Sequence, residues 1–160
     1  MSTLLFFHGR ESGPGGTKAR WLAARYGAFT PTLDTTRLEV AVAQATDAVL
    51  AHSPTCVVGS SFGGAVAVAL LQAGVLTAPV VLIAPAAHKL GVPNRLPAGT
   101  RATVLHGDGD DIVPLADSIA LAATGGPAVQ LTVIQGGDHR LNRILEDGSL
   151  ERAIAPYWPR

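Results

Sequence analysis

The chain has 160 residues, 48% of them apolar and 15% charged, which predicts one compact domain over residues 1–160 and excludes a disordered chain. Its 12 basic and 12 acidic side chains balance, so no net charge attracts nucleic acid or an anionic membrane surface. The apolar runs are too short to cross a membrane, no cationic segment precedes the first of them, and Cys56 is the only cysteine. We therefore expect a cytoplasmic protein without an internal disulfide.

Apolar runs and helical patterns alternate along the chain. Runs typical of buried parallel strands are predicted at residues 3–7, 28–30, 55–58, 79–84, 102–105 and 129–134. Helices are predicted at 17–26, 37–51, 62–73 and 115–123, with short closing helices at 141–145 and 150–154. This alternation predicts a three-layer α/β/α domain with a mostly parallel sheet of about six strands.

The segment Gly59-Ser60-Ser61-Phe62-Gly63 joins a predicted strand to a predicted helix. A strand that becomes a helix through one residue forces that residue into a strained backbone conformation, and glycines two positions before and after it allow neighbouring backbone to come close. The Ser61 hydroxyl is then held above a helix N-terminus, which favours developing negative charge. The segment therefore predicts a nucleophilic serine, with a plain glycine-rich turn as the alternative.

Polar side chains follow four of the predicted strands: His8 the first, Ser61 the third, Asp110 the fifth and His139 the sixth. The carboxyl ends of parallel strands meet at one edge of a sheet, where ligands bind near the switch in strand order. We therefore expect these four side chains to gather at one site.

Taken with the chain order Ser, Asp, His, four local motifs resemble the α/β-hydrolase superfamily over residues 4 to about 154. They are His8-Gly9, Gly59-x-Ser61-x-Gly63, His106-Gly107-x-x-Asp110-x-x-Val113-Pro114 and Gly137-Asp138-His139. The third motif is similar to the acid-residue loop of small capless serine esterases, such as dienelactone-hydrolase-like enzymes and minimal bacterial hydrolases. The resemblance implies that Asp110 is the acid of a catalytic triad, with Asp108 or Asp111 as the alternatives.

The chain departs from larger members of that superfamily by being shorter. Its first predicted strand already carries the His-Gly turn, so the pattern lacks the two leading strands of the full fold, and no cap domain fits between Ser61 and Asp110. We expect a trimmed α/β-hydrolase fold with a shallow, open pocket, unless the loop at 9–16 or the loop at 85–99 folds over it.

The resemblance implies two-step acyl transfer through an acyl-enzyme. Ser61 attacks a carbonyl while His139 accepts its proton and then returns it to the leaving group. Asp110 holds the imidazole in the tautomer that this transfer needs and stabilises the imidazolium. The backbone N–H groups of Phe62 and Arg10 are the expected oxyanion hole.

Two other kinds of site fit the sequence poorly. Residues 13–18 lack the Gly-Lys-Ser/Thr order of a phosphate-binding loop, in which lysine reaches phosphate and the hydroxyl reaches magnesium. A metal site built from His106, Asp108 and Asp110 would lack the paired histidines that hydrolytic metal centres use. Nucleotide binding and metal-dependent hydrolysis are therefore minor alternatives.

The resemblance and the residues that carry it together imply a carboxylesterase-like serine hydrolase that acts on esters or thioesters of small acyl groups, without cofactor, metal, nucleic-acid or membrane partner. The absence of a cap favours short acyl chains over long-chain lipids. His8 and Gly9 are candidates for substrate contact, and ordering of the oxyanion loop is the other role open to His8. Lactones and peptides suit the same chemistry, and a catalytically silent binding module or scaffold is the non-enzymatic alternative.

Overall fold

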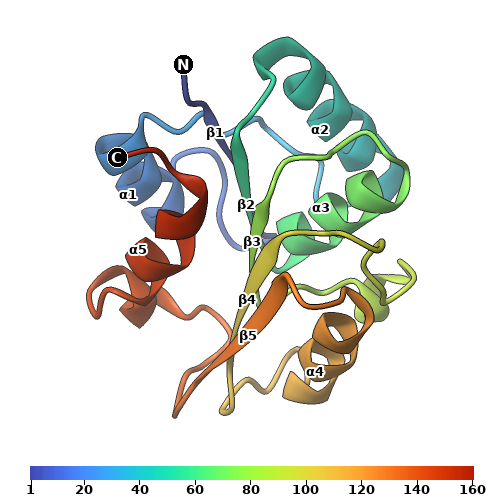
Figure 1. Ribbon diagram of the computed structural model, residues 1–160, viewed down its shortest axis with the longest axis vertical. Helices are drawn as coiled ribbons and strands as arrows, with labels where there is room; N and C mark the ends of the chain where they lie inside the picture. Colours follow the sequence, from blue (N-terminus) through green and yellow to red (C-terminus); the bar gives the residue numbers. More distant parts are fainter.

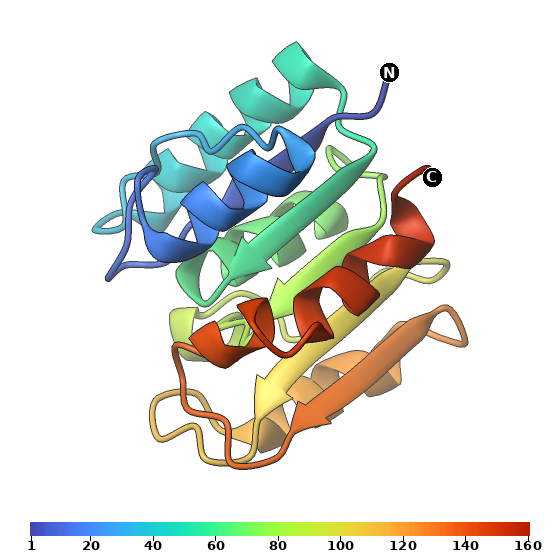
Figure 2. The same ribbon diagram turned by 90° about the vertical axis from the view of Figure 1, so that its left-hand side faces the viewer.

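The computed structural model describes all 160 residues and contains one five-stranded sheet (Figure 1). The strands are β1 (Leu4–Phe7), β2 (Cys56–Ser60), β3 (Val80–Ile83), β4 (Ala102–Gly107) and β5 (Val129–Ile134). They run parallel in the order β1-β2-β3-β4-β5, so neighbours in the chain are neighbours in the sheet. All carboxyl ends consequently point to one edge, where the connecting loops gather (Figure 2).

Helices cover both faces of the sheet. On one face lie α1 (Thr17–Tyr26) and α5 (Ser149–Ile154), and on the other lie α2 (Leu38–His52), α3 (Phe62–Gln72) and α4 (Leu115–Thr124) (Figure 1). Three short 3₁₀ helices are η1 (His88–Leu90), η2 (Asn142–Leu145) and η3 (Ala155–Tyr157). None of the helices combines the length and the apolar character that a membrane crossing needs. The three layers confirm the predicted α/β/α class.

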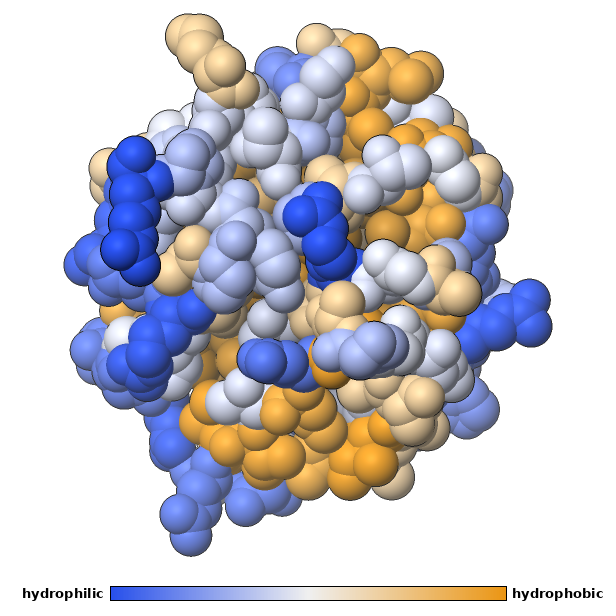
Figure 3. All heavy atoms as spheres, viewed as in Figure 1, coloured by the Kyte–Doolittle hydropathy of each residue, from blue (hydrophilic) through white to orange (hydrophobic).

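The central strands are buried on both faces, which explains why their sequences are nearly continuous apolar runs. Along β1 the side chains alternate: Leu5 and Phe7 join the core beneath α2 and α3, whereas Leu4 and Phe6 join the core beneath α1 and α5. The edge strand β5 differs, since most of its side chains are exposed or half-buried. Apolar atoms therefore gather on the surface over β5 and α4, where Val133 is exposed (Figure 3).

The sheet has five strands rather than about six, because the predicted strand at 28–30 makes only one isolated bridge. Phe29 donates its N–H to Leu4 O and accepts the Phe6 N–H, both at 3.0 Å. Pro31 follows and has no N–H to continue the ladder. The bridge lies on the side of β1 opposite β2. After β1 the chain therefore first passes along one side of this strand, at Phe29, and then forms β2 on the other side. Ligands of open α/β sheets bind at such a switch in strand order.

Candidate active site

Ser61 lies at a sharp turn between β2 and α3. Its φ of 52° and ψ of −108° fall in a region that non-glycine residues rarely adopt, at a cost of roughly 1–3 kcal/mol. A Cβ on Gly59 would lie 2.7 Å from Gly63 O, and a Cβ on Gly63 would lie 1.9 Å from Phe7 O. Real Cβ atoms do not approach so closely, so both glycines are needed for α3 to pack directly on the ends of β1 and β2.

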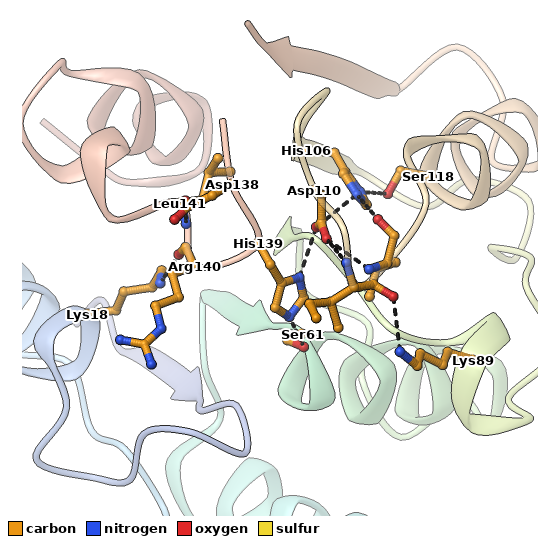
Figure 4. A network of polar contacts seen from close by, with 12 residues as sticks. Lys18, Ser61, Lys89, His106, Asp110, Ser118, Asp138, His139, Arg140 and Leu141 are labelled. Carbon is orange, nitrogen blue, oxygen red and sulfur yellow. Dashed lines mark hydrogen bonds and ion pairs between the residues drawn. The ribbon is translucent and has the colours of Figure 1, made fainter. Parts of the chain in front are cut away.

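Ser61, His139 and Asp110 form a hydrogen-bonded chain (Figure 4). Ser61 Oγ lies 2.9 Å from His139 Nε2, and His139 Nδ1 lies 2.8 Å from Asp110 Oδ2. The three residues follow β2, β5 and β4, so the edge of the sheet joins side chains that are distant in the sequence. A carboxylate only accepts hydrogen bonds, so Nδ1 carries a proton and Nε2 of a neutral imidazole is free to accept the proton of Ser61.

The Asp110 carboxylate is fixed by its own loop. Its side chain is fully buried, and Oδ1 accepts the N–H groups of Ile112 at 2.9 Å and Val113 at 2.8 Å. Burial alone would raise the pKa of this carboxyl group. The hydrogen bonds from His139 and from the two backbone N–H groups outweigh burial and hold the pKa of Asp110 below its ordinary value. Asp110 is therefore ionised at neutral pH.

The two neighbouring carboxylates do not reach His139. Asp108 Oδ1 accepts the Gly136 N–H at 2.6 Å, which ties the loop after β4 to the loop after β5. Asp111 is exposed and forms no side-chain hydrogen bond or ion pair. Of the three candidate acids, Asp110 alone contacts the histidine.

The loop that carries His139 is held by close backbone packing. A Cβ on Gly107 would lie 2.1 Å from Gly137 O, so glycine at the end of β4 lets the loop after β5 approach. Asp138 Oδ1 accepts the Leu141 N–H at 2.9 Å and so fixes the turn directly after His139. These contacts fix the position of the His139 imidazole.

His106 lies behind Asp110, fully buried. Its Nε2 donates to Val113 O at 2.9 Å and lies 3.2 Å from Asp110 Oδ2, while Nδ1 shares a hydrogen bond of 2.6 Å with Ser118 Oγ. Both ring nitrogens are thus engaged, and no group of His, Cys, Asp or Glu side chains in the protein is arranged to hold a metal ion. The contribution of Ser118 was missed in the sequence, where its only signal is a hydroxyl between Asp117 and the apolar run that follows in α4.

The two expected oxyanion donors both line the cleft beside Ser61. Phe62 is the first residue of α3, so its backbone N–H has no acceptor within the helix, and the positive end of the helix dipole lies at the same point. The backbone N–H of Arg10 donates to no group of the protein. Neither N–H group is therefore paired within the protein.

His8, one of the two candidates for substrate contact, does not line the cleft. The ring is buried, with Nε2 accepting the Leu33 N–H at 3.0 Å and Nδ1 donating to Gly9 O at 2.9 Å. These contacts connect the end of β1 to the segment before α2 and order the loop that carries Arg10. Gly9 does line the cleft, and its contact with a substrate stays a prediction.

The cleft above Ser61 has a volume of about 380 Å³. The loops at 9–16 and 85–99, which were expected to be able to fold over the pocket, both contribute to its walls. Arg10 and Ser12 come from the loop after β1, and Lys89 comes from η1 in the loop after β3. The segment that follows His139 forms a third wall. The site is therefore a cleft between loops and not a tunnel beneath a separate domain.

Lys18 links two of these walls. Its Nζ donates to Arg140 O and, at 2.9 Å, to Asn142 Oδ1. Burial lowers the pKa of Lys18 to about 8, against the attraction of the Asp138 carboxylate and together with the repulsion of the Arg140 guanidinium. A lysine with this pKa carries most of its charge at neutral pH and loses it in mild alkali.

No protein-family model and no curated protein matches the sequence. Several solved structures match its fold. A proposed hydrolase of the alpha/beta superfamily from Xanthomonas campestris pv. campestris has a TM-score of 0.77 at 24% identity, over 98% of this chain and 97% of that chain. An a/b serine hydrolase without lid from Xanthomonas campestris gives 0.75 at 19% identity, over 99% of this chain and 83% of that one.

A third solved structure, alpha/beta hydrolase domain-containing protein 10 from mouse, has a TM-score of 0.73 at 18% identity, over 96% of this chain and 90% of that chain. Likeness at these identities establishes the architecture and not the activity. The protein has an α/β-hydrolase fold, in a trimmed form without a cap domain.

Proposed function

We propose that the protein is a serine hydrolase that cleaves carboxylic ester or thioester bonds of small acyl substrates. The observation that carries the proposal is the unbroken hydrogen-bonded chain from Ser61 Oγ through His139 to the buried carboxylate of Asp110. Such a chain supplies the adjacent base that a serine hydroxyl needs in order to act as a nucleophile.

In the first step, Ser61 Oγ attacks the carbonyl carbon of the substrate while His139 Nε2 takes the hydroxyl proton. The tetrahedral intermediate collapses as the bond to the alcohol or thiol breaks and His139 gives that group the proton. Water then attacks the acyl-enzyme by the same route, which releases the acid and restores Ser61. Asp110 orients the imidazole and stabilises the imidazolium without taking its proton.

The negative charge of each tetrahedral intermediate develops on the former carbonyl oxygen. The N–H groups of Phe62 and Arg10 are the donors for this oxygen, because both line the cleft and neither is used by the fold. Each donor of this kind contributes about 100- to 1,000-fold to turnover. His8 acts on this step indirectly, by holding Gly9 and the loop that carries Arg10.

The dimensions of the cleft favour small acyl groups. Its volume of about 380 Å³ lies at the lower end of the range for small-molecule sites. No cap domain stands over Ser61 to enclose a long alkyl chain. We therefore expect short-chain esters to be turned over faster than long-chain lipids.

Covalent labelling with a fluorophosphonate probe tests the proposal. The intact protein is expected to be labelled at Ser61, and labelling is expected to vanish in Ser61→Ala and in His139→Ala. Ser12→Ala is the matched control, because Ser12 also lines the cleft but contacts no base. Hydrolysis of 4-nitrophenyl butyrate should fall at least about 10⁴-fold in Ser61→Ala.

A folded protein that is not labelled, and that hydrolyses no ester or thioester from acetyl to octanoyl, would contradict the proposal. That result would favour the non-enzymatic alternative, a hydrolase fold that serves as a binding module.

A further inference from the structure

The charged side chains of the cleft are almost all of one sign. Of the 12 basic residues in the chain, four line the cleft, against one of the 12 acidic residues. The basic residues are Arg10, Lys18, Lys89 and Arg140, and the acidic residue is Glu11. The chain contains only two lysines, and both are in this set. A protein of zero net charge thus concentrates positive charge around Ser61.

These cations surround the reacting groups. Lys18 and Arg140 lie to one side of His139, and Lys89 lies to the other side (Figure 4). They come from α1, from the segment after β5 and from η1, which are distant in the sequence. Their convergence is therefore produced by the fold and not by one basic stretch of chain.

Most of this charge is not neutralised within the protein. Lys89 Nζ donates to Ile112 O at 3.0 Å, and Lys18 donates to a backbone carbonyl and to the amide oxygen of Asn142. Neutral oxygens satisfy N–H groups but leave the charge in place. The guanidinium of Arg10 stands 5.5 Å from the centre of the Phe62 ring and pairs with no carboxylate.

Three carboxylates lie near these cations. Asp110 is ionised, but it is fully buried behind His139 and does not line the cleft. Glu11 pairs with Arg140 at 2.8 Å, so this pair contributes no net charge. Asp138 acts on Lys18 at longer range, but it does not line the cleft and its Oδ1 accepts the Leu141 N–H. Three positive charges, those of Arg10, Lys18 and Lys89, remain without a partner in the cleft.

We propose that the cleft selects acyl substrates that carry a second, negatively charged group, a carboxylate or a phosphate, in addition to the carbonyl that Ser61 attacks. This inference rests on the proposed hydrolase function and specifies its substrate class. Lysine and arginine side chains form charge-assisted hydrogen bonds with such groups and raise their local concentration in a cleft. A neutral ester of the same size gains neither effect.

Pairs of esters of similar size, one anionic and one neutral, test the inference. In the first pair, 4-nitrophenyl hydrogen succinate is compared with 4-nitrophenyl butyrate, so the charge lies on the acyl side. In the second pair, 4-carboxyphenyl butyrate is compared with 4-carbamoylphenyl butyrate, so the charge lies on the leaving group. The anionic ester of at least one pair should have a kcat/KM about tenfold higher or more at low ionic strength, and this preference should shrink towards 1 M salt.

Three variants connect the preference to the cleft. Lys89→Met and Lys18→Met should each lower the ratio of anionic to neutral kcat/KM by about fivefold, mainly through the KM of the anionic ester. Arg101→Met is the control, because Arg101 is an exposed cation at the amino end of β4, away from the carboxyl edge where the cleft lies. It should leave both ratios unchanged. Circular dichroism and fluorophosphonate labelling verify that each variant is folded.

Equal or higher kcat/KM for the neutral ester of both pairs would overturn the inference and leave the hydrolase proposal intact. A preference that survives in both lysine variants would overturn it as well. If no ester is hydrolysed and Ser61 is not labelled, the hydrolase proposal fails, and calorimetry with succinate and succinamide still decides the anion site. Succinate binding that is lost in Lys89→Met would support the site, and absence of succinate binding to the intact protein would refute it.

Discussion

At the scale of single residues, the Asp110 carboxylate stands between two histidines. Its Oδ2 is 2.8 Å from His139 Nδ1 and 3.2 Å from His106 Nε2. Val113 O can only accept a hydrogen bond, so Nε2 of His106 carries a proton that lies between this carbonyl and the carboxylate. His106 thereby positions the loop that presents Asp110, although it does not reach Ser61.

Asp110→Asn should reduce kcat for 4-nitrophenyl butyrate by about 10³- to 10⁴-fold, because the amide can donate to His139 and stabilise the wrong tautomer. Asp111→Asn is the matched control, since Asp111 is exposed and contacts neither histidine. Initial-rate kinetics of the two variants check the prediction. Similar losses in both would argue that the loop as a whole, and not the carboxylate of Asp110, carries the effect.

Lys18 should make the preference for anionic esters depend on pH. Its pKa is lowered to about 8, so the side chain is cationic below that pH and neutral above it. The ratio of anionic to neutral kcat/KM should therefore fall as the pH rises from 7 to 9. Measuring both esters at each pH cancels the titration of the shared catalytic groups, and the fall should be absent in Lys18→Met. An equal fall in that variant would assign it to another group.

At the scale of elements, the position of α3 depends on the absence of side chains at its start. The first turn of α3 lies against the end of β1, and a Cβ at Gly63 would be 1.9 Å from Phe7 O and 2.8 Å from His8 O. Phe7 is the last residue of β1, and His8 directly after it is fixed by the hydrogen bonds of its ring to Leu33 and Gly9. The helix can therefore approach the sheet only if residue 63 is glycine.

Gly63→Ala should destabilise the protein by about 3 kcal/mol or more, because α3 would have to move away from β1. Gly13→Ala is the control, since no atom lies within 4 Å of a Cβ at that position. Urea unfolding curves of the two variants measure the difference. A Gly63→Ala protein as stable as Gly13→Ala would mean that α3 moves at little cost.

At the scale of the whole molecule, positive charge gathers at one edge of a neutral protein. The loops after β1, β3 and β5 all contribute to it, and Glu11 supplies the one negative charge of the cleft. Glu11 and Arg140 are both largely exposed, so their ion pair contributes little to stability. Glu11 therefore controls the charge of the cleft more than the stability of the fold.

Glu11→Gln should raise kcat/KM for the anionic ester severalfold by releasing Arg140, and should change the free energy of unfolding by less than about 1 kcal/mol. The neutral ester of the same pair serves as the internal reference. A lower kcat/KM for the anionic ester would show that Glu11 is needed to hold Arg140 in place.

The elements of the fold were largely predictable because their signals are local. Buried parallel strands are apolar throughout, and the turn at Ser61 carries its glycines at fixed spacing. The prediction of a strand at residues 28–30 was wrong, because Pro31 has no N–H to continue the hydrogen bonds to β1 beyond the single bridge at Phe29. Asp110 and His139 could be placed at one edge, since carboxyl ends of parallel strands converge.

Contacts between elements that are distant in the sequence could not be predicted in this way. Ser118 reaches His106 through the burial of one face of α4, which the helix sequence does not specify. Lys18 lies in α1 and Lys89 in η1, and only the fold brings these two segments to the same cleft. The positive charge of the cleft thus arises only in the folded chain, and no sequence motif predicts it.

The strained backbone conformation of Ser61 lowers the stability of the protein at the residue that the proposed activity requires. A glycine would adopt φ 52° without the strain that serine bears. The residue proposed as the nucleophile is therefore less favourable for the stability of the fold than glycine would be. Selection for thermal robustness alone would favour loss of the nucleophile. If the chain works as a hydrolase, serine is retained at this turn because selection acts on catalytic activity more strongly than on stability.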